Sequence, residues 1–134
     1  MKALSFKQPW AWLVFNGKDV DNRNWRTNYR GRVCVHASKG WDAAGFTWLF
    51  LNREKLNWLN WWDRMMIENA KNEMPFGALV GEVDITDCVT QSDSPWFFGK
   101  YGFVLSNPIA YAKPIPYKGQ LNIFEIILTG EGRK

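Results

Sequence analysis

The chain has 134 residues, of which 46% are hydrophobic and 22% charged, values typical of a globular protein, and its length predicts one domain over residues 1–134. No apolar stretch approaches the roughly 18 residues of a membrane-spanning helix, and the start lacks the features of a signal peptide, so we expect a cytoplasmic protein with no membrane partner. The net charge is +4, and residues 1–40 hold eight Lys or Arg against two Asp, which indicates either an anionic partner such as nucleic acid or a basic solvated face.

The first forty residues predict a strand, a short helix and a second strand. Residues 2–6 alternate apolar and polar side chains, as in a half-buried strand. Pro9 suits the first turn of a helix, and the Asn-Gly pair at 16–17 is typical of a helix end. Residues 31–37 are rich in β-branched side chains and predict a strand, which we expect residues 38–40 to terminate.

Residues 41–73 have a helical pattern without proline. One helix of more than thirty residues is too long for a small domain, so we expect two helices separated near residues 57–60. Residues 78–89 then form the longest predicted strand, in which Gly81 marks a bulge.

The last third of the chain predicts several short strands. We expect strands at 101–105 and 109–112 joined by a turn at 107–108, and an extended, proline-containing segment that cannot be a central strand at 113–120. The last predicted strand is 123–128, and residues 130–134 form a tail. This order of elements predicts an α+β fold with a mixed sheet or small barrel and flanking helices.

The sequence argues against a metal or cofactor. Cys34 and Cys88 lie in apolar, strand-like runs, where buried and reduced thiols are expected. One histidine and two distant cysteines do not supply the clustered ligands of a zinc site. We therefore expect neither a metal nor a cofactor.

A polar-aromatic segment follows the first predicted helix. If residues 20–25 are extended, Asp21, Arg23 and Trp25 alternate onto one face. A carboxylate beside a guanidinium stays ionised and holds the arginine in place, while Lys18 is available for a phosphate or for proton transfer. The alternative is an Asp–Arg pair that only stabilises a loop.

Two further segments combine basic and aromatic residues. His36, at a strand end, precedes Ser38 and Lys39, and it is either a structural histidine or part of a site. Aromatic side chains that include Trp96 and Tyr101 are candidates for stacking on bases, and Lys118 for contacting phosphate, although such aromatics equally suit a core.

Two weaker signals remain. Glu82 and Asp84 share one face of the long strand and form a candidate acid/base pair. The WLNWW segment at 58–62 suits core packing, but its aromatic density leaves open a protein partner or a homodimer.

Six segments, in order along the chain, resemble the ASCH domain family. They are LSFKQPWAWLV, K-x-x-D-x-R-x-W, RGRVCVHASKG, GALVGEVDITDCV, W-x-x-G-x-YGF and PIPYKGQLNIFEI, and they extend from Leu4 to Ile127. ASCH domains are similar to the PUA domain, so the resemblance implies a PUA-like small mixed β-barrel with flanking helices. It also implies a cleft that receives RNA or a nucleotide.

The family signature, G-x-K-x-x-E-x-R, matches here at Lys18 and Arg23. Asp21 replaces the glutamate and reaches less far, and Asn16 occupies the glycine position. By resemblance, Gln8, Trp10 and Trp25 line the same cleft. With the two other segments, the predicted binding residues are Gln8, Trp10, Lys18, Asp21, Arg23, Trp25, His36, Ser38, Lys39, Trp96, Tyr101 and Lys118.

Some ASCH-like proteins are enzymes, and this makes a hydrolase the alternative function. One branch resembles an amidohydrolase acting on N4-acetylcytidine, but it has a threonine where this chain has Asp21. Another member resembles a ribonuclease acting on single-stranded RNA, a reaction that needs a base, an acid and cations. Lys18 and Asp21 are the candidate catalytic residues, with Arg23 and His36 as further groups. The leading prediction remains RNA or nucleotide binding.

Overall fold

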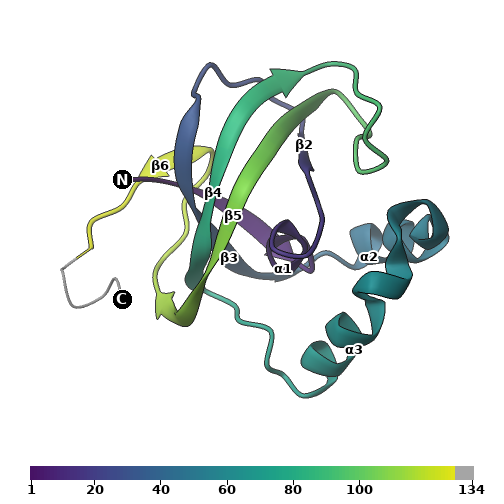
Figure 1. Ribbon diagram of the computed structural model, residues 1–134. Coiled ribbons are helices and arrows are strands. Elements are labelled where there is room, and N and C mark those ends of the chain that lie inside the picture. The colour runs from purple at the N-terminus through teal and green to yellow at the C-terminus, as the bar shows by residue number, and fades with distance from the viewer. Residues whose placement is uncertain (129–134) are drawn as a thin grey trace.

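The computed structural model describes residues 1–128, so the predicted tail at 130–134 lies outside the described part (Figure 1). The elements are β1 Lys2–Gln8, α1 Trp10–Val14, β2 Val20–Arg23, β3 Gly31–Trp41, α2 Ala43–Leu51, the 3₁₀ turns η1 Arg53–Leu56 and η2 Trp58–Asn60, α3 Trp62–Ala70, β4 Ala78–Val89, β5 Tyr101–Pro116 and β6 Ile123–Glu125. Within residues 1–128, no helix has the length and apolar character needed to cross a bilayer.

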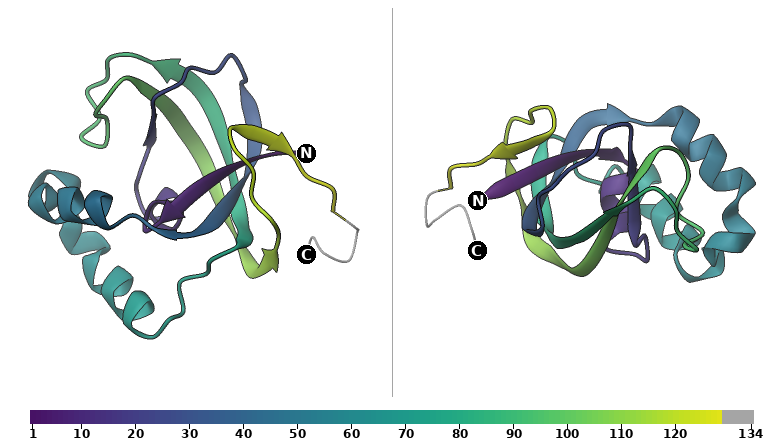
Figure 2. Two further views of the ribbon diagram at one scale, coloured as in Figure 1. Left: turned by 180° about the vertical axis from the view of Figure 1, so that it is seen from behind. Right: turned by 90° about the horizontal axis from the view of Figure 1, so that it is seen from above.

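The six strands form one mixed sheet in the order β2-β5-β4-β3-β1-β6. β1 and β3 are parallel, and the other neighbouring pairs are antiparallel. The sheet is strongly curved, and α2 and α3 lie at its side away from β6 (Figures 1 and 2). The α+β prediction is confirmed. Across residues 1–128 the strand pairing does not close into a barrel, so the expected barrel is not confirmed.

The sheet leaves part of one strand edge uncovered. β6 pairs with β1 only at Lys2, Ala3 and Leu4, where Leu4 lies opposite Ile123. Among the described residues, no strand pairs with residues 5–8 of β1 on this side. The backbone of this segment is therefore available to side chains from other elements, and it forms the floor of the site described below.

β5 corrects two predictions for the last third of the chain. The expected turn at 107–108 is wrong, because β5 continues through it as one strand. Ser106 pairs with Asp84 and Ile109 with Glu82, so β5 takes three steps where β4 takes two. The Asn-Pro pair thus lies in a β-bulge with one extra residue. Asn107 has a positive φ (55°), and the bulge allows this conformation within the strand.

The prolines of β5 lie where one edge of the strand is not paired. β2 pairs only with residues 101–104 of β5, so residues 109–116 pair with β4 alone. Pro114 and Pro116 lack an N–H group, and a half-strand with one neighbour tolerates this loss. The expectation that residues 113–120 cannot form a central strand agrees with this pairing, although residues 113–116 do belong to a strand.

The bounds of β4 and of the helical region agree with the prediction, whereas the end of β3 does not. β4 has the predicted bounds, and the ladders with β3 and β5 both shift near Gly81, which confirms the bulge. A Cβ atom at Gly81 would lie 2.5 Å from the Ile109 carbonyl oxygen, so the close approach requires glycine. The helical region is interrupted by η1 and η2, as expected. β3 does not end at residue 38 but continues to Trp41, since pairing with β1 outweighs the local Ser-Lys-Gly signal.

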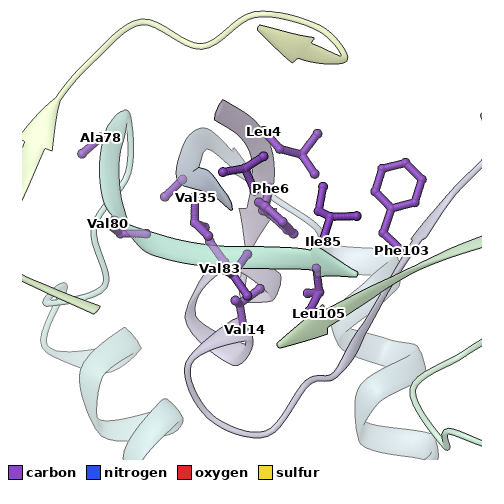
Figure 3. Packing of buried hydrophobic residues seen from close by; sticks show 13 residues of the cluster. Leu4, Phe6, Val14, Val35, Ala78, Val80, Val83, Ile85, Phe103 and Leu105 are labelled. Atoms are coloured by element: carbon purple, nitrogen blue, oxygen red, sulfur yellow. The ribbon is translucent and has the colours of Figure 1, made fainter. Parts of the chain in front are cut away.

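Among residues 1–128, buried apolar side chains form three clusters. The largest lies between the concave face of the sheet and α1 (Figure 3), and includes Leu4, Phe6, Val14, Val35, Val83, Ile85, Phe103 and Leu105. A second cluster holds the helical region against α1 and contains Trp12, Leu13, Leu49, Leu56, Trp61, Met65 and Trp96. Most of the tryptophan content is therefore used to attach the helices, with Trp61 of WLNWW 3% exposed.

Candidate functional site

The main cavity runs along the uncovered edge of β1 and has a volume of about 1390 Å³. Its polar and charged lining residues are Ser5, Lys7, Lys18, Asp21, Asn22, Arg23, His36, Ser38, Lys39, Asp42, Tyr117, Lys118, Gln120 and Asn122. Five Lys or Arg side chains face only two carboxylates, so the cavity is electropositive. The aromatic lining residues are Phe6, Trp10, Trp25, Trp48 and Phe98. This cavity is hereafter called the cleft.

Three charged side chains form a buried cluster at the cleft floor, hereafter the triad. Asp21, from β2, accepts hydrogen bonds from Lys18 Nζ at 2.8 Å and from Arg23 Nε at 2.5 Å. Lys18 and Asp21 are only 4% and 5% exposed. The extended backbone of β2 places Asp21 and Arg23 on the same face, as the sequence predicted. The triad carries two positive charges and one negative charge.

The electrostatics of the triad follow from burial and from this charge imbalance. Burial lowers the pKa of Lys18, although the attraction of Asp21 opposes the effect. Burial alone would raise the pKa of Asp21, but the charges of Arg23 and Lys18 outweigh it and lower the pKa of that carboxyl. Asp21 is therefore ionised, and both of its oxygens are engaged. An anionic ligand would supply the negative charge that the triad lacks.

Arg23 connects β2 to the uncovered edge of β1. Its Nη2 donates to the Ser5 carbonyl oxygen at 2.7 Å, so the guanidinium takes the place of a neighbouring strand. The Phe6 ring supports both cations, with Arg23 Cζ 5.1 Å and Lys18 Nζ 5.8 Å from its centroid. The triad is thus held rigidly by backbone and ring contacts.

His36 lies on the opposite side of β1 from the triad. Ser5 and Phe6 are consecutive in the strand, so their side chains point to opposite faces; Phe6 contacts the triad and Ser5 contacts His36. His36 Nε2 lies 2.7 Å from the Tyr117 carbonyl oxygen and must donate to it, because a carbonyl only accepts. Nδ1 then accepts from the Ser5 hydroxyl at 2.9 Å. The cleft spans both faces at the edge of β1.

One wall of the cleft is aromatic. Trp10 at the start of α1 donates from Nε1 to Asp42 at 2.8 Å, and Asp42 also caps α2 through the Gly45 N–H. The Trp10 and Trp48 ring centroids are 6.3 Å apart, and Trp48 packs against Phe98 at 4.6 Å. Helix capping by Asp42 therefore also fixes the orientation of a ring in the cleft.

The remaining predicted cleft residues occupy the rim and the opposite wall. Lys39 and Lys118 are exposed, and Trp25 is half-buried with its ring against Phe103 at 5.1 Å. Ser38 lines the cleft with a buried hydroxyl that has no hydrogen-bond partner among the described residues. This hydroxyl is available to a ligand.

Three predicted binding residues do not line the cleft. Gln8 is 1% exposed, and its amide bonds the Pro75 carbonyl and the Trp12 N–H, which makes it a structural residue. Trp96 is buried in the helical cluster, and its carbonyl accepts from Asn22. Tyr101 pairs with Arg23 through the backbone of β5, outside the cleft.

The suggested Glu82–Asp84 acid/base pair is not present as such. Arg32 lies between the two carboxylates, 3.3 Å from Glu82 and 3.0 Å from Asp84. Hydrogen bonds from Asn107 and Arg32 lower the pKa of Asp84. Neither residue lines the cleft, because both point away from the face that carries Val83 and Ile85.

Sequence reasoning missed several cleft residues. Trp48 and Asp42 belong to the segment at 41–73, for which the sequence predicted only helices. Asn122 lies on the segment between β5 and β6, whose position depends on the pairing of β6 with β1.

Comparisons with known proteins identify one family and two distant relatives. A sequence model of the ASCH domain matches residues 4–129. The chain is 31% identical over 143 residues to activating signal cointegrator 1 of Homo sapiens, and 30% identical over 138 residues to the protein of that name from Mus musculus. Each alignment covers 92% of this chain but only 22% of the relative, so the chain spans about a fifth of their length.

Proposed function

Because the chain belongs to the ASCH domain family, within the PUA-like superfamily, we propose that its cleft binds RNA or a nucleotide. The observation that carries the proposal is the buried triad, in which two cations share one carboxylate at the floor of an electropositive cleft. A phosphate is the anion that suits this arrangement, since arginine and lysine are the main phosphate-binding side chains of proteins.

The binding mode follows from the distribution of side chains. The phosphate lies against Lys18 and Arg23, while Asp21 keeps the guanidinium oriented. A base packs on the half-buried aromatic wall that includes Trp48, where stacking tolerates any base. The unpartnered Ser38 hydroxyl and the rim lysine Lys39 supply further contacts to sugar or phosphate.

Binding to a 5′-phosphorylated single-stranded RNA should weaken steeply with salt. If two to four cations contact phosphates, log K should fall with log salt concentration at a slope of roughly −1.5 to −3. Fluorescence anisotropy across a salt series measures this slope. Lys39→Gln should make this slope shallower by about 0.7. Lys71 is an exposed lysine outside the cleft, so Lys71→Gln should leave the slope unchanged. Affinity independent of salt would contradict phosphate binding.

A hydrolase acting in the same cleft is the second candidate, and the Ser5–His36 hydrogen bond favours it. His36 accepts from the Ser5 hydroxyl and is oriented by the Tyr117 carbonyl, an arrangement of nucleophile, base and orienting group. Asp21 suits the role of base less well, because both its oxygens are bonded to cations and its pKa is lowered.

Ser5→Ala tests this second candidate. If the chain deacetylates N4-acetylcytidine, the variant should lose at least about 100-fold in rate, because the nucleophile is gone. Its affinity for RNA should stay near that of the wild type. Equal rates for Ser5→Ala and wild type would exclude Ser5 as the nucleophile.

A further inference from the structure

A second cavity adjoins the cleft. It has a volume of about 380 Å³ and is lined by Lys2, Trp25, Thr27, Tyr29, Asn122 and Ile123. Trp25 and Asn122 also line the cleft, so these two residues form the partition between the two cavities. The volume lies in the lower part of the range for small-ligand sites, about 300–1,000 Å³.

The second cavity combines the same two kinds of side chain as the cleft. Tyr29 is half-buried, and its hydroxyl donates to the Arg32 carbonyl at 2.8 Å, which fixes the ring. Its backbone N–H donates to the buried Thr27 hydroxyl at 3.1 Å. Trp25 is fixed from behind by its edge contact with Phe103. The cavity therefore presents two aromatic rings whose orientations are already fixed.

A cation is positioned over this aromatic surface. Lys2 Nζ lies 5.8 Å from the Tyr29 ring centroid and pairs with Glu125 at 2.7 Å. The ion pair is solvent-exposed, and exposed pairs of this kind contribute little to stability. Lys2 can therefore exchange Glu125 for a phosphate at low cost.

We infer that the second cavity binds the nucleotide adjacent to the one in the cleft, so that the ligand is a single-stranded oligonucleotide that passes over Trp25. This inference rests on the proposed function and extends it from one nucleotide to two. The base of the second nucleotide packs against Tyr29, and Lys2 contacts its phosphate. Trp25 separates the two nucleotides and prevents them from stacking directly on each other.

A ladder of short ligands tests the inference. The probes are the 5′-phosphorylated adenylates of one, two and three nucleotides, with the deoxy series in parallel, titrated by calorimetry. The dinucleotide should bind about 5- to 20-fold more tightly than the mononucleotide, because one further base is stacked. The third nucleotide should add less. A gain in either sugar series supports the second site, and a gain only in the ribose series identifies RNA as the ligand.

Substitutions in the second cavity test whether the additional affinity of the dinucleotide arises there. Tyr29→Leu should reduce dinucleotide affinity to the level of the mononucleotide. Tyr29→Phe keeps the ring and loses only the hydrogen bond to the Arg32 carbonyl, so it should retain most of the dinucleotide gain. Mononucleotide affinity should be unchanged in both, which shows that the cleft is intact. Lys2→Gln should weaken only ligands of two or more nucleotides, and Lys71→Gln should weaken none.

Two outcomes overturn the inference in distinguishable ways. If mononucleotide and dinucleotide bind equally, or if the gain survives Tyr29→Leu, the second cavity is not a nucleotide site while the cleft still is. If neither ligand binds at low salt, the proposed function fails as well.

Discussion

Asp21→Asn should destabilise the fold by about 3–5 kcal/mol, the usual cost of removing one partner from a buried ion pair. Asp21 is 5% exposed and is the carboxylate that neutralises Lys18 and Arg23. Its loss leaves the positive charges of Lys18 and Arg23 close together in a poorly solvated part of the cleft. The asparagine amide has one acceptor oxygen, so it cannot replace the two carboxylate oxygens that accept from these cations. Urea unfolding followed by circular dichroism measures the change.

The pH dependence of this effect has a definite sign. The pKa of Asp21 is lowered by the charges of Arg23 and Lys18 from an ordinary value of 3.8, so its stabilising contribution is complete above that pH. The contribution is lost as the pH falls further, and the gap between wild type and Asp21→Asn should narrow below about pH 4. Asp93→Asn, at an exposed position, is the control and should change stability by less than about 0.5 kcal/mol. A similarly small change for Asp21→Asn would show that the triad does not hold the fold.

Lys18→Met should have the opposite balance, with a large loss of binding and a small change in stability. Removing the buried ammonium ends its desolvation cost, which is the main cause of its lowered pKa, and leaves Asp21 paired with Arg23. A charged hydrogen bond to phosphate is worth about 1.5–3 kcal/mol, so affinity for a phosphorylated oligonucleotide should fall roughly 10- to 100-fold.

The matched control for Lys18→Met is Lys39→Met, at the exposed rim of the cleft. A solvated lysine contributes less to binding, so the loss there should be no more than about fivefold. Equal losses for the two variants, or unchanged affinity for Lys18→Met, would show that phosphate does not reach the triad.

The bounds of a strand could be predicted from the local sequence wherever its apolar residues are also the residues that the fold buries. β4 has the predicted bounds because its inward-facing residues are apolar over its central part. The turn at Asn107-Pro108 was wrong because the same pair can reverse a chain or form a bulge, and only the ladder with β4 selects between them. The parallel pairing of β1 with β3 joins residues about thirty positions apart, and no local pattern encodes it.

Some residues of the candidate site could also be predicted from the local sequence, and others could not. Asp21 and Arg23 were placed together by the two-residue period of an extended strand, and this holds in β2. Gln8 was carried over by resemblance, but its position at the end of β1 directs the amide to backbone groups. For Trp96 the difference between core and binding surface depends on the packing of α1 and the helical region, which residue type alone does not determine.

The position of β1 between β3 and β6 also has a consequence for the order of folding. Residues 2–4 lie opposite residues 123–125, so β1 cannot gain its second neighbour until β6 has been synthesised. Asn122 precedes that pairing directly and lines both cavities. Sequence separation of this kind slows folding, because a long loop must close before the contact is gained. A nascent chain on the ribosome should therefore acquire ligand-binding competence only after residues 122–125 have been synthesised.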